Sequence, residues 1–176
     1  LELAAQMKQD RMLGRDAPTA AVLHGRNVAM LFEKASLRTR STFEIAVREL
    51  GGDLVVLQPD AGLGKREPVA DVARNLERWF DAVIIRTFSQ RVLEEFVAAA
   101  PRLRVINALT DEQHPCQAIS DCMTVRERWG SVRGRTIAYV GDGNNVAVSL
   151  AHAALMLGIN LHVASPDGYQ LPRLAV

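Results

Sequence analysis

The stretch VAMLFEKASLRTRSTFEIAVRELGGDLVVL (residues 28–57) decides the fold class. It opens with a short apolar run, residues 28–32, which has the length and composition of a buried strand. Residues 39–50 then carry apolar side chains at spacings of three, four and seven, which is typical of an amphipathic helix. Two glycines stop that helix, and a second apolar run follows at residues 54–57. The order strand, helix, strand predicts a parallel pair joined by a crossover.

The same rhythm continues along the chain. It predicts an α/β fold, in which a parallel sheet carries helices on both faces. Residues 1–130 are expected to form this domain, WGSVRGRT (129–136) a linker or surface turn, and residues 131–176 the beginning of a second, Rossmann-like domain. The further strands are predicted at 82–86, 104–108, 136–141 and 160–164. The further helices are predicted at 1–13 (apolar face Leu3, Met7 and Leu13), 68–80, 89–99 and 115–129, and a last helix follows the strand at 136–141 and runs to about residue 157.

In open parallel sheets, ligands bind beyond the carboxyl ends of the strands. That rule places the loops 33–38, 58–67, 86–88 and 109–115 at a common site. Each loop contains polar or charged residues, which supports the placement.

Composition excludes several classes of function. The net charge is +1, so overall charge gives no case for a nucleic-acid or membrane partner. No apolar run is long enough to span a membrane, and the first ten residues lack the features of a signal peptide. Cys116 and Cys122 form neither a disulfide framework nor a zinc pattern, which fits a reducing, cytoplasmic compartment.

The segment FEKASLRTR (32–40) leaves a strand and enters a helix, so its backbone N–H groups and positive dipole end favour an anion. Ser36 and Thr39 add hydroxyl donors, and Arg38 adds a planar fork for phosphate oxygens. The alternative is that a hydroxyl merely caps the helix and that the arginines are solvated. Arg86, at the end of the apolar strand AVIIR, is a further candidate for contact with the anion.

Two other turns carry candidate residues. In HPCQ (114–117), His114 can donate to a carbonyl oxygen and the carbonyl of Gln117 can accept from an amide; the alternative is a satisfied surface histidine. GDGNN (141–145) lacks G-x-G-x-x-G, which argues against a dinucleotide site. Asn144 and Asn145 suit a carboxylate or an amino group, or serve as turn formers and caps.

FEK followed by SLRTR, with HPCQ and GDGNN in this order, resembles the transcarbamoylase family across nearly the whole chain, and its ornithine branch in particular. The resemblance implies two substrates, carbamoyl phosphate and L-ornithine, and no metal or redox cofactor. The reaction would transfer the carbamoyl group to the δ-amino group of ornithine, a step of the arginine-biosynthesis or urea-cycle type. A homotrimer, or a multiple of trimers, is implied as well.

The resemblance also assigns roles. Ser36, Arg38, Thr39 and the backbone N–H of Leu37, which stands where many members have Thr, would hold the phosphate. Arg86 would bridge phosphate and carbonyl oxygen, His114 would polarise the carbonyl, Gln117 would hold the carbamoyl amide, and Asn145 would meet the backbone groups of ornithine. Arg38, Arg86 and His114 would be the catalytic residues.

This sequence departs from the family pattern at two places. Gly62 stands where members often carry a Gln that reaches a neighbouring subunit, and Lys65 or Arg66 are the candidate substitutes. The family's later D-x-x-x-S-M-G and H-C-L-P segments do not occur before Val176, so we expect about half of a two-domain protein, with little activity by itself. Two rivals stay open: a transcarbamoylase for aspartate, putrescine or a modified ornithine, and a non-catalytic phosphate-binding fragment.

Overall fold

The computed structural model describes residues 1–58 and 63–172. These form two compact units, residues 2–108 and residue 109 onward together with Leu1. The first unit contains a four-stranded sheet with the strand order β2-β1-β3-β4. Its elements are α1 (Glu2–Asp10), the 3-10 helix η1 (Arg11–Asp16), β1 (Asn27–Phe32), α2 (Leu37–Glu49), β2 (Asp53–Leu57), α3 (Val69–Trp79), β3 (Ala82–Arg86), α4 (Gln90–Ala99) and β4 (Arg104–Leu109).

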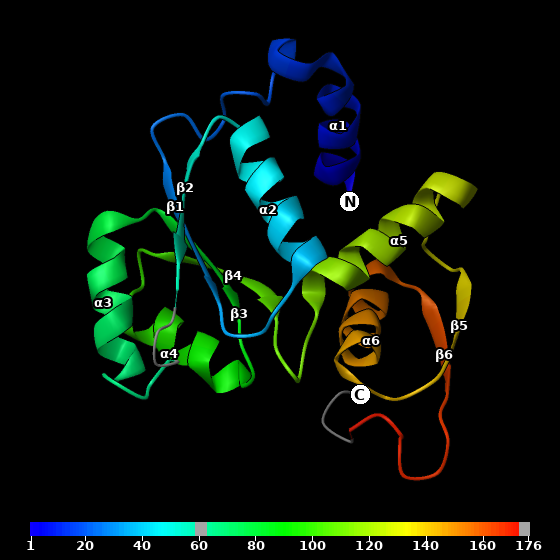
Figure 1. Ribbon diagram of the computed structural model, residues 1–176. Coiled ribbons are helices and arrows are strands. Elements are labelled where there is room, and N and C mark those ends of the chain that lie inside the picture. Colours follow the sequence, from blue (N-terminus) through cyan, green and yellow to red (C-terminus); the bar gives the residue numbers. More distant parts are fainter. Residues whose placement is uncertain (59–62, 173–176) are drawn as a thin grey trace. The chain divides into compact units, whose positions relative to one another are not determined.

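The two central strands read as uninterrupted apolar runs because both of their faces are covered. β1 pairs in parallel with β2 on one side and with β3 on the other. Ala29 and Leu31 of β1 join Val83 and Ile85 of β3 in one core cluster, to which α3 and α4 contribute. The alternate residues of the same strands, Val28, Met30 and Ile84, belong to a second cluster with Val47 of α2. Figure 1 shows α2 on one face of the sheet and α3 and α4 on the other, which confirms the predicted α/β arrangement.

The strand order reverses beside β1. The chain leaves β1 towards β2 on one side and returns to β3 on the other, so the loops that follow β1 and β3 diverge at their carboxyl ends. Phe32 and Arg86 are partners at this end of the β1–β3 pair. Such a switch point is where open parallel sheets bind ligands. The SLRTR motif, which follows β1, and Arg86, which ends β3, therefore both lie at this switch point.

The second unit is built around one βαβ motif. Its elements are α5 (Pro115–Trp129), β5 (Thr136–Val140), α6 (Asn145–Leu157) and β6 (Asn160–Ala164), with β5 and β6 paired in parallel. Cys122 of α5 packs with Leu150 and Ala154 of α6 in its core. The predicted linker also contributes, because Val132 is buried there at 7% exposure.

Several predicted boundaries were wrong. The helix expected over 1–13 ends at Asp10, and η1 contains a kink at Gly14, whose φ of 60° lies outside the helical region. Leu3 and Leu13, expected on its apolar face, are exposed. α2 begins at Leu37 rather than residue 39, because Ser36 already takes the extended conformation of an N-cap.

Candidate functional site

The structure places the SLRTR segment (residues 36–40) at the N-terminus of α2. Ser36 is the N-cap, and its side chain makes no capping hydrogen bond among the described residues, so its hydroxyl is not used for the cap. Leu37 is the first helical residue and is 84% exposed, and its backbone N–H belongs to the first turn, where such groups lack an intrahelical partner. Arg38 is exposed as well. The capping alternative for Ser36 is therefore not what this structure contains.

Arg86 adjoins this turn. Its Nη1 donates to the hydroxyl of Thr39 at 3.3 Å, which links the end of β3 to the first turn of α2. Its Nε is buried and has no hydrogen-bond partner among residues 1–58 and 63–172. Burial lowers the pKa of the Arg86 guanidinium from its usual value, although such a group stays charged at neutral pH. The structure thus brings Arg86 and Thr39, two of the residues predicted to hold an anion, into contact.

Glu33, which is not among the site residues predicted from the sequence, lies three residues before Ser36. Its side-chain oxygens accept hydrogen bonds from the backbone N–H of Leu63, at 2.7 Å, and from the hydroxyl of Thr87. Its own N–H donates to the carbonyl of Arg86 at 2.9 Å. Thr87 is 1% exposed, so its hydroxyl needs a partner within the protein, and no local sequence pattern identifies Glu33 as that partner.

His114 belongs to the second unit, where it is the N-cap of α5. The turn before it closes on itself, because the backbone N–H of Gln113 donates to the hydroxyl of Thr110 at 3.0 Å. The backbone N–H of His114 donates to the hydroxyl of Ser149 on α6 at 2.7 Å. Thr110 and Ser149 are both buried, and neither was predicted.

Gln117 and Asn145 have one amide group each already engaged. Nε2 of Gln117 donates to Asp121 at 2.9 Å, so its Oε1 is the group that could accept from a ligand. Nδ2 of Asn145 donates to the carbonyl of Thr110 at 2.7 Å, which turns its Oδ1 into the available acceptor. Asn144 caps α6 by accepting from two backbone N–H groups, so the capping interpretation holds for Asn144.

The predicted site residues therefore form two groups in different compact units. Ser36, Leu37, Arg38, Thr39 and Arg86 lie in the first unit, and the second unit holds His114, Gln117 and Asn145. Lys65 and Arg66 are exposed in the first unit, and Gly62 lies outside the described residues.

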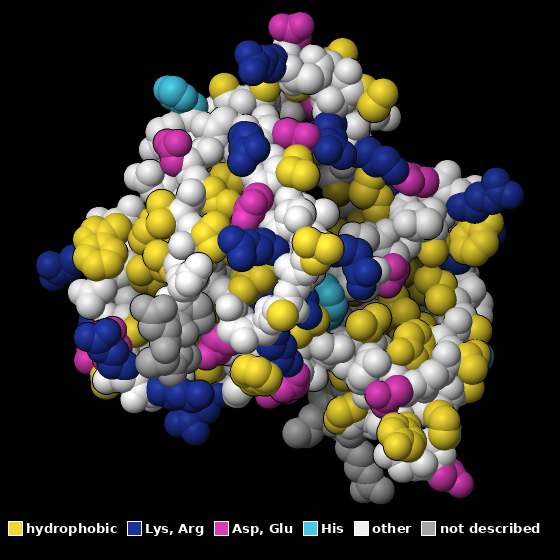
Figure 2. Space-filling model, viewed as in Figure 1, with side chains coloured by type: hydrophobic (Ala, Val, Ile, Leu, Met, Phe, Trp, Pro, Cys, Tyr) yellow, Lys and Arg dark blue, Asp and Glu magenta, His cyan; other side chains and the backbone are white. Residues whose placement is uncertain are grey.

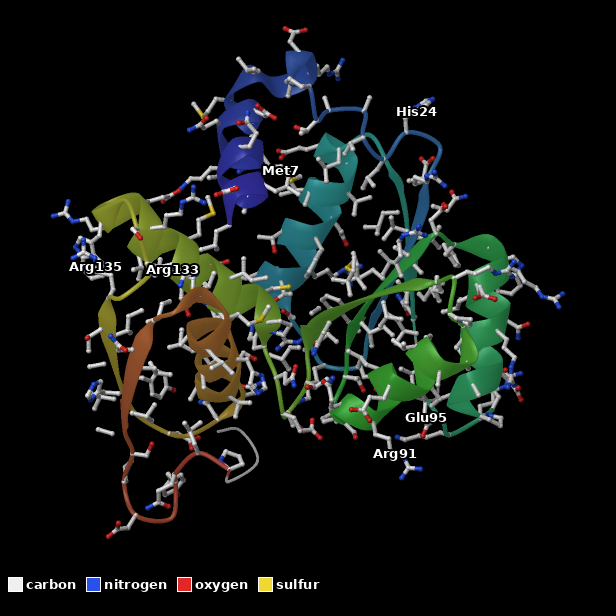
Figure 3. The ribbon with its side chains drawn as sticks, turned by 180° about the vertical axis from the view of Figure 1, so that it is seen from behind. Met7, His24, Arg91, Glu95, Arg133 and Arg135 are labelled. Atoms are coloured by element: carbon white, nitrogen blue, oxygen red, sulfur yellow. The ribbon has the colours of Figure 1, made fainter. Side chains whose placement is uncertain are left out.

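An open groove elsewhere on the first unit is lined by none of the predicted site residues. It has a volume of about 870 Å³ and lies along α1, η1 and α2, lined by residues that include Met7, Arg11 and Ile45. Met7 lies on the side of α1 that faces α2 (Figure 3). Lys and Arg side chains are scattered over the face shown in Figure 2. Within the described part of the chain, no group of three His, Cys, Asp or Glu residues could hold a metal ion. No described helix combines the length and apolarity that crossing a membrane requires.

Comparison with known proteins gives matches along the whole chain. Residues 1–127 match the model of the aspartate/ornithine carbamoyltransferase carbamoyl-P binding domain, and residues 133–175 match that of the Asp/Orn binding domain. An ornithine carbamoyltransferase of Parafrankia sp. (strain EAN1pec) is 49% identical over 172 residues, which are 97% of this chain and 53% of that protein. The chain spans about half the length of the curated relatives it matches.

Solved structures agree. Ornithine carbamoyltransferase from Thermus thermophilus superposes with a TM-score of 0.86 at 42% identity, over 99% of this chain and 61% of that chain. The ornithine carbamoyltransferase from Pyrococcus furiosus gives a TM-score of 0.88 at 38% identity, over 99% and 56%.

Proposed function

Because this chain belongs to the aspartate/ornithine carbamoyltransferase family, we propose that it supplies the carbamoyl-phosphate site of an ornithine carbamoyltransferase. The observation that carries the proposal is the hydrogen bond between Arg86 and Thr39. It joins the end of β3 to the N-terminus of α2 at the switch point of the sheet, where backbone N–H groups and a guanidinium are suited to bind an anion.

The phosphate is held by four groups in this proposal. They are the hydroxyls of Ser36 and Thr39, the backbone N–H of Leu37 and the guanidinium of Arg38. Arg86 touches both the phosphate and the carbonyl oxygen. Charge-assisted hydrogen bonds of this kind are about twice as strong as neutral ones, so a dianionic phosphate is the ligand that such a set favours.

The carbamoyl group is held by the second set. His114 donates to the carbonyl oxygen, and Oε1 of Gln117 accepts from the carbamoyl amide. The bond from Nε2 of Gln117 to Asp121 supports this orientation, because it leaves the acceptor end for the ligand. In the same way, the contact between Asn145 and Thr110 leaves an acceptor oxygen, which suits the α-ammonium group of ornithine.

The chemical step is the one that the family resemblance implies. The neutral δ-amino nitrogen of ornithine attacks the carbonyl carbon, a C–N bond forms, and the carbonyl oxygen gains negative charge. The C–O bond to phosphate then breaks, phosphate leaves with the electron pair, and the nitrogen loses a proton. Arg86 and His114 stabilise the charge where it develops. The products are citrulline and phosphate.

The finer parts of the proposal rest on the family resemblance. They are a cytoplasmic enzyme of arginine biosynthesis, a trimer, and a division near residue 130 between the two substrate-binding domains. The two family models meet between residues 127 and 133. The compact units of the structure instead separate at residue 108, because the His114 turn packs with α6.

The test measures carbamoyl transfer by the protein as its gene encodes it, with ornithine, aspartate, putrescine and N-acetylornithine as acceptors. Citrulline formation that exceeds every other product supports the ornithine assignment. Preference for another acceptor would favour the first rival, and carbamoyl phosphate binding without turnover would favour the second.

A further inference from the structure

Glu33 joins three segments at the carboxyl end of the sheet. One side-chain oxygen accepts from the backbone N–H of Leu63, which precedes α3, and the other accepts from the hydroxyl of Thr87, which follows β3. The backbone N–H of Glu33 donates to the carbonyl of Arg86. Glu33 itself lies at the end of β1, three residues before Ser36.

The negative charge of Glu33 would itself repel a phosphate bound at the neighbouring turn, so its charge is not what would favour an anion. What the side chain offers is two acceptor oxygens that both have donors. Without them, the N–H of Leu63 and the buried hydroxyl of Thr87 would each need another partner.

Thr87 follows Arg86 directly, so the hydrogen bond from Thr87 to Glu33 also restrains the backbone of Arg86. Fixing the side chain of Thr87 fixes the backbone from which the Arg86 side chain departs. Arg86 in turn reaches Thr39 of the anion turn. Because Nε of Arg86 has no hydrogen-bond partner among the described residues, the guanidinium depends on its backbone and on Thr39 for its position.

We propose that Glu33 is a positioning residue of the carbamoyl-phosphate site: it sets Arg86 through Thr87, and it sets the loop that carries Lys65 and Arg66 through the N–H of Leu63. The inference rests on the proposed function, since the anion at this site is carbamoyl phosphate. It adds that a carboxylate which touches no substrate determines how tightly the phosphate is held.

Calorimetry of the 176-residue chain with carbamoyl phosphate and with inorganic phosphate tests the proposal. Glu33→Ala is expected to weaken both ligands by about tenfold, equivalent to about 1.4 kcal/mol. Glu33→Gln keeps an acceptor for Leu63 and offers a donor to the hydroxyl of Thr87, and it removes the repelling charge. That variant is expected to bind both ligands at least as tightly as the wild type.

Two further variants complete the design. Thr87→Val has nearly the same shape without the hydroxyl and should also weaken binding. Glu94→Ala removes the same charge from an exposed position on α4 and should leave affinity unchanged. Hydrogen exchange adds an independent readout, because the amide of Leu63 should exchange faster in Glu33→Ala and not in Glu33→Gln.

The outcomes separate this inference from the proposed function. If the wild type binds neither anion, both fall. If the wild type binds and a folded Glu33→Ala binds equally well, only the role of Glu33 falls. A lower unfolding midpoint with unchanged affinity would likewise mean that Glu33 only stabilises the fold, and it would overturn the inference. Should Glu33→Ala fail to fold, the affinities of Glu33→Gln and Thr87→Val decide.

Discussion

The hydroxyl of Ser149 accepts a hydrogen bond from the backbone N–H of His114, across 35 residues of sequence and at 2.7 Å. One turn earlier on the same helix, Asn145 donates to the carbonyl of Thr110. Positions four apart lie on the same face of a helix. α6 therefore holds both ends of the turn that presents His114.

Ser149→Ala should destabilise the chain by about 1–3 kcal/mol, because it leaves a part-buried N–H without its acceptor. Urea unfolding followed by circular dichroism measures the change. Ser120→Ala is the matched control: its hydroxyl donates to a helix carbonyl at an exposed position, and it should change stability by no more than about 0.5 kcal/mol. Equal effects of the two variants would contradict the role given to Ser149.

Arg38→Ala should weaken carbamoyl phosphate binding by about 1.5–3 kcal/mol, which is typical of a hydrogen bond to a charged group. Titration calorimetry measures this directly. Arg40 provides the control from the same motif, since its guanidinium is paired with Glu44 one turn along α2. Arg40→Ala should bind nearly as well as the wild type, and an unchanged affinity in Arg38→Ala would remove Arg38 from the site.

The sequence predicted the central strands well, for a physical reason. β1 and β3 are buried on both faces, so their apolar runs are continuous and their ends are sharp. Arg86 and the SLRTR turn could be selected as candidates from the sequence because each follows or ends a predicted strand, and their roles stay predictions.

The positioning residues could not be found in this way. Ser149 lies inside the apolar helix NVAVSLAHAALML, and nothing local distinguishes it from a neutral helix residue. Its partner is set by how α5 and α6 pack, as are the partners of Glu33, which lie 30 and 54 residues away. Local pattern also failed for residues 11–16, where Gly14 turns the chain out of the helix.

Gln117→Ala should lower the affinity for carbamoyl phosphate and leave the affinity for inorganic phosphate nearly unchanged, because only the former presents an amide to Oε1. Competition between the two ligands in one calorimetric series gives both values. Asp121→Ala should have a smaller effect in the same direction, since it releases the orientation of the Gln117 amide. An equal loss for both ligands would show that Gln117 contacts the phosphate.

Both cysteines should be alkylated slowly in the native protein. Burial raises the pKa of the Cys116 thiol, and burial together with the negative charge of Asp121 raises the pKa of the Cys122 thiol. A raised pKa keeps the thiol protonated at neutral pH, and only the thiolate reacts. Mass spectrometry after iodoacetamide treatment at pH 7 should therefore show slow labelling, which speeds up as the pH rises and in guanidinium chloride. Native labelling as fast as in the unfolded chain would contradict this.

The last prediction is that the 176-residue chain alone makes little or no citrulline. An uncovered apolar face is not the general reason, because Val148 and Leu150 of α6 are buried, although Leu155 and Met156 are more than 80% exposed. The reason is that ornithine would not be held in position. Among the described residues, Asn145 is the one proposed to bind ornithine, and the chain spans about half the length of its relatives. Correct orientation of two reactants can contribute about 7–11 kcal/mol to the barrier, so its loss should slow turnover by many orders of magnitude. A colorimetric citrulline assay on the chain, after its intact mass is verified, measures this. Turnover near one per second, a typical enzyme rate, would show that residues 1–176 suffice to orient ornithine.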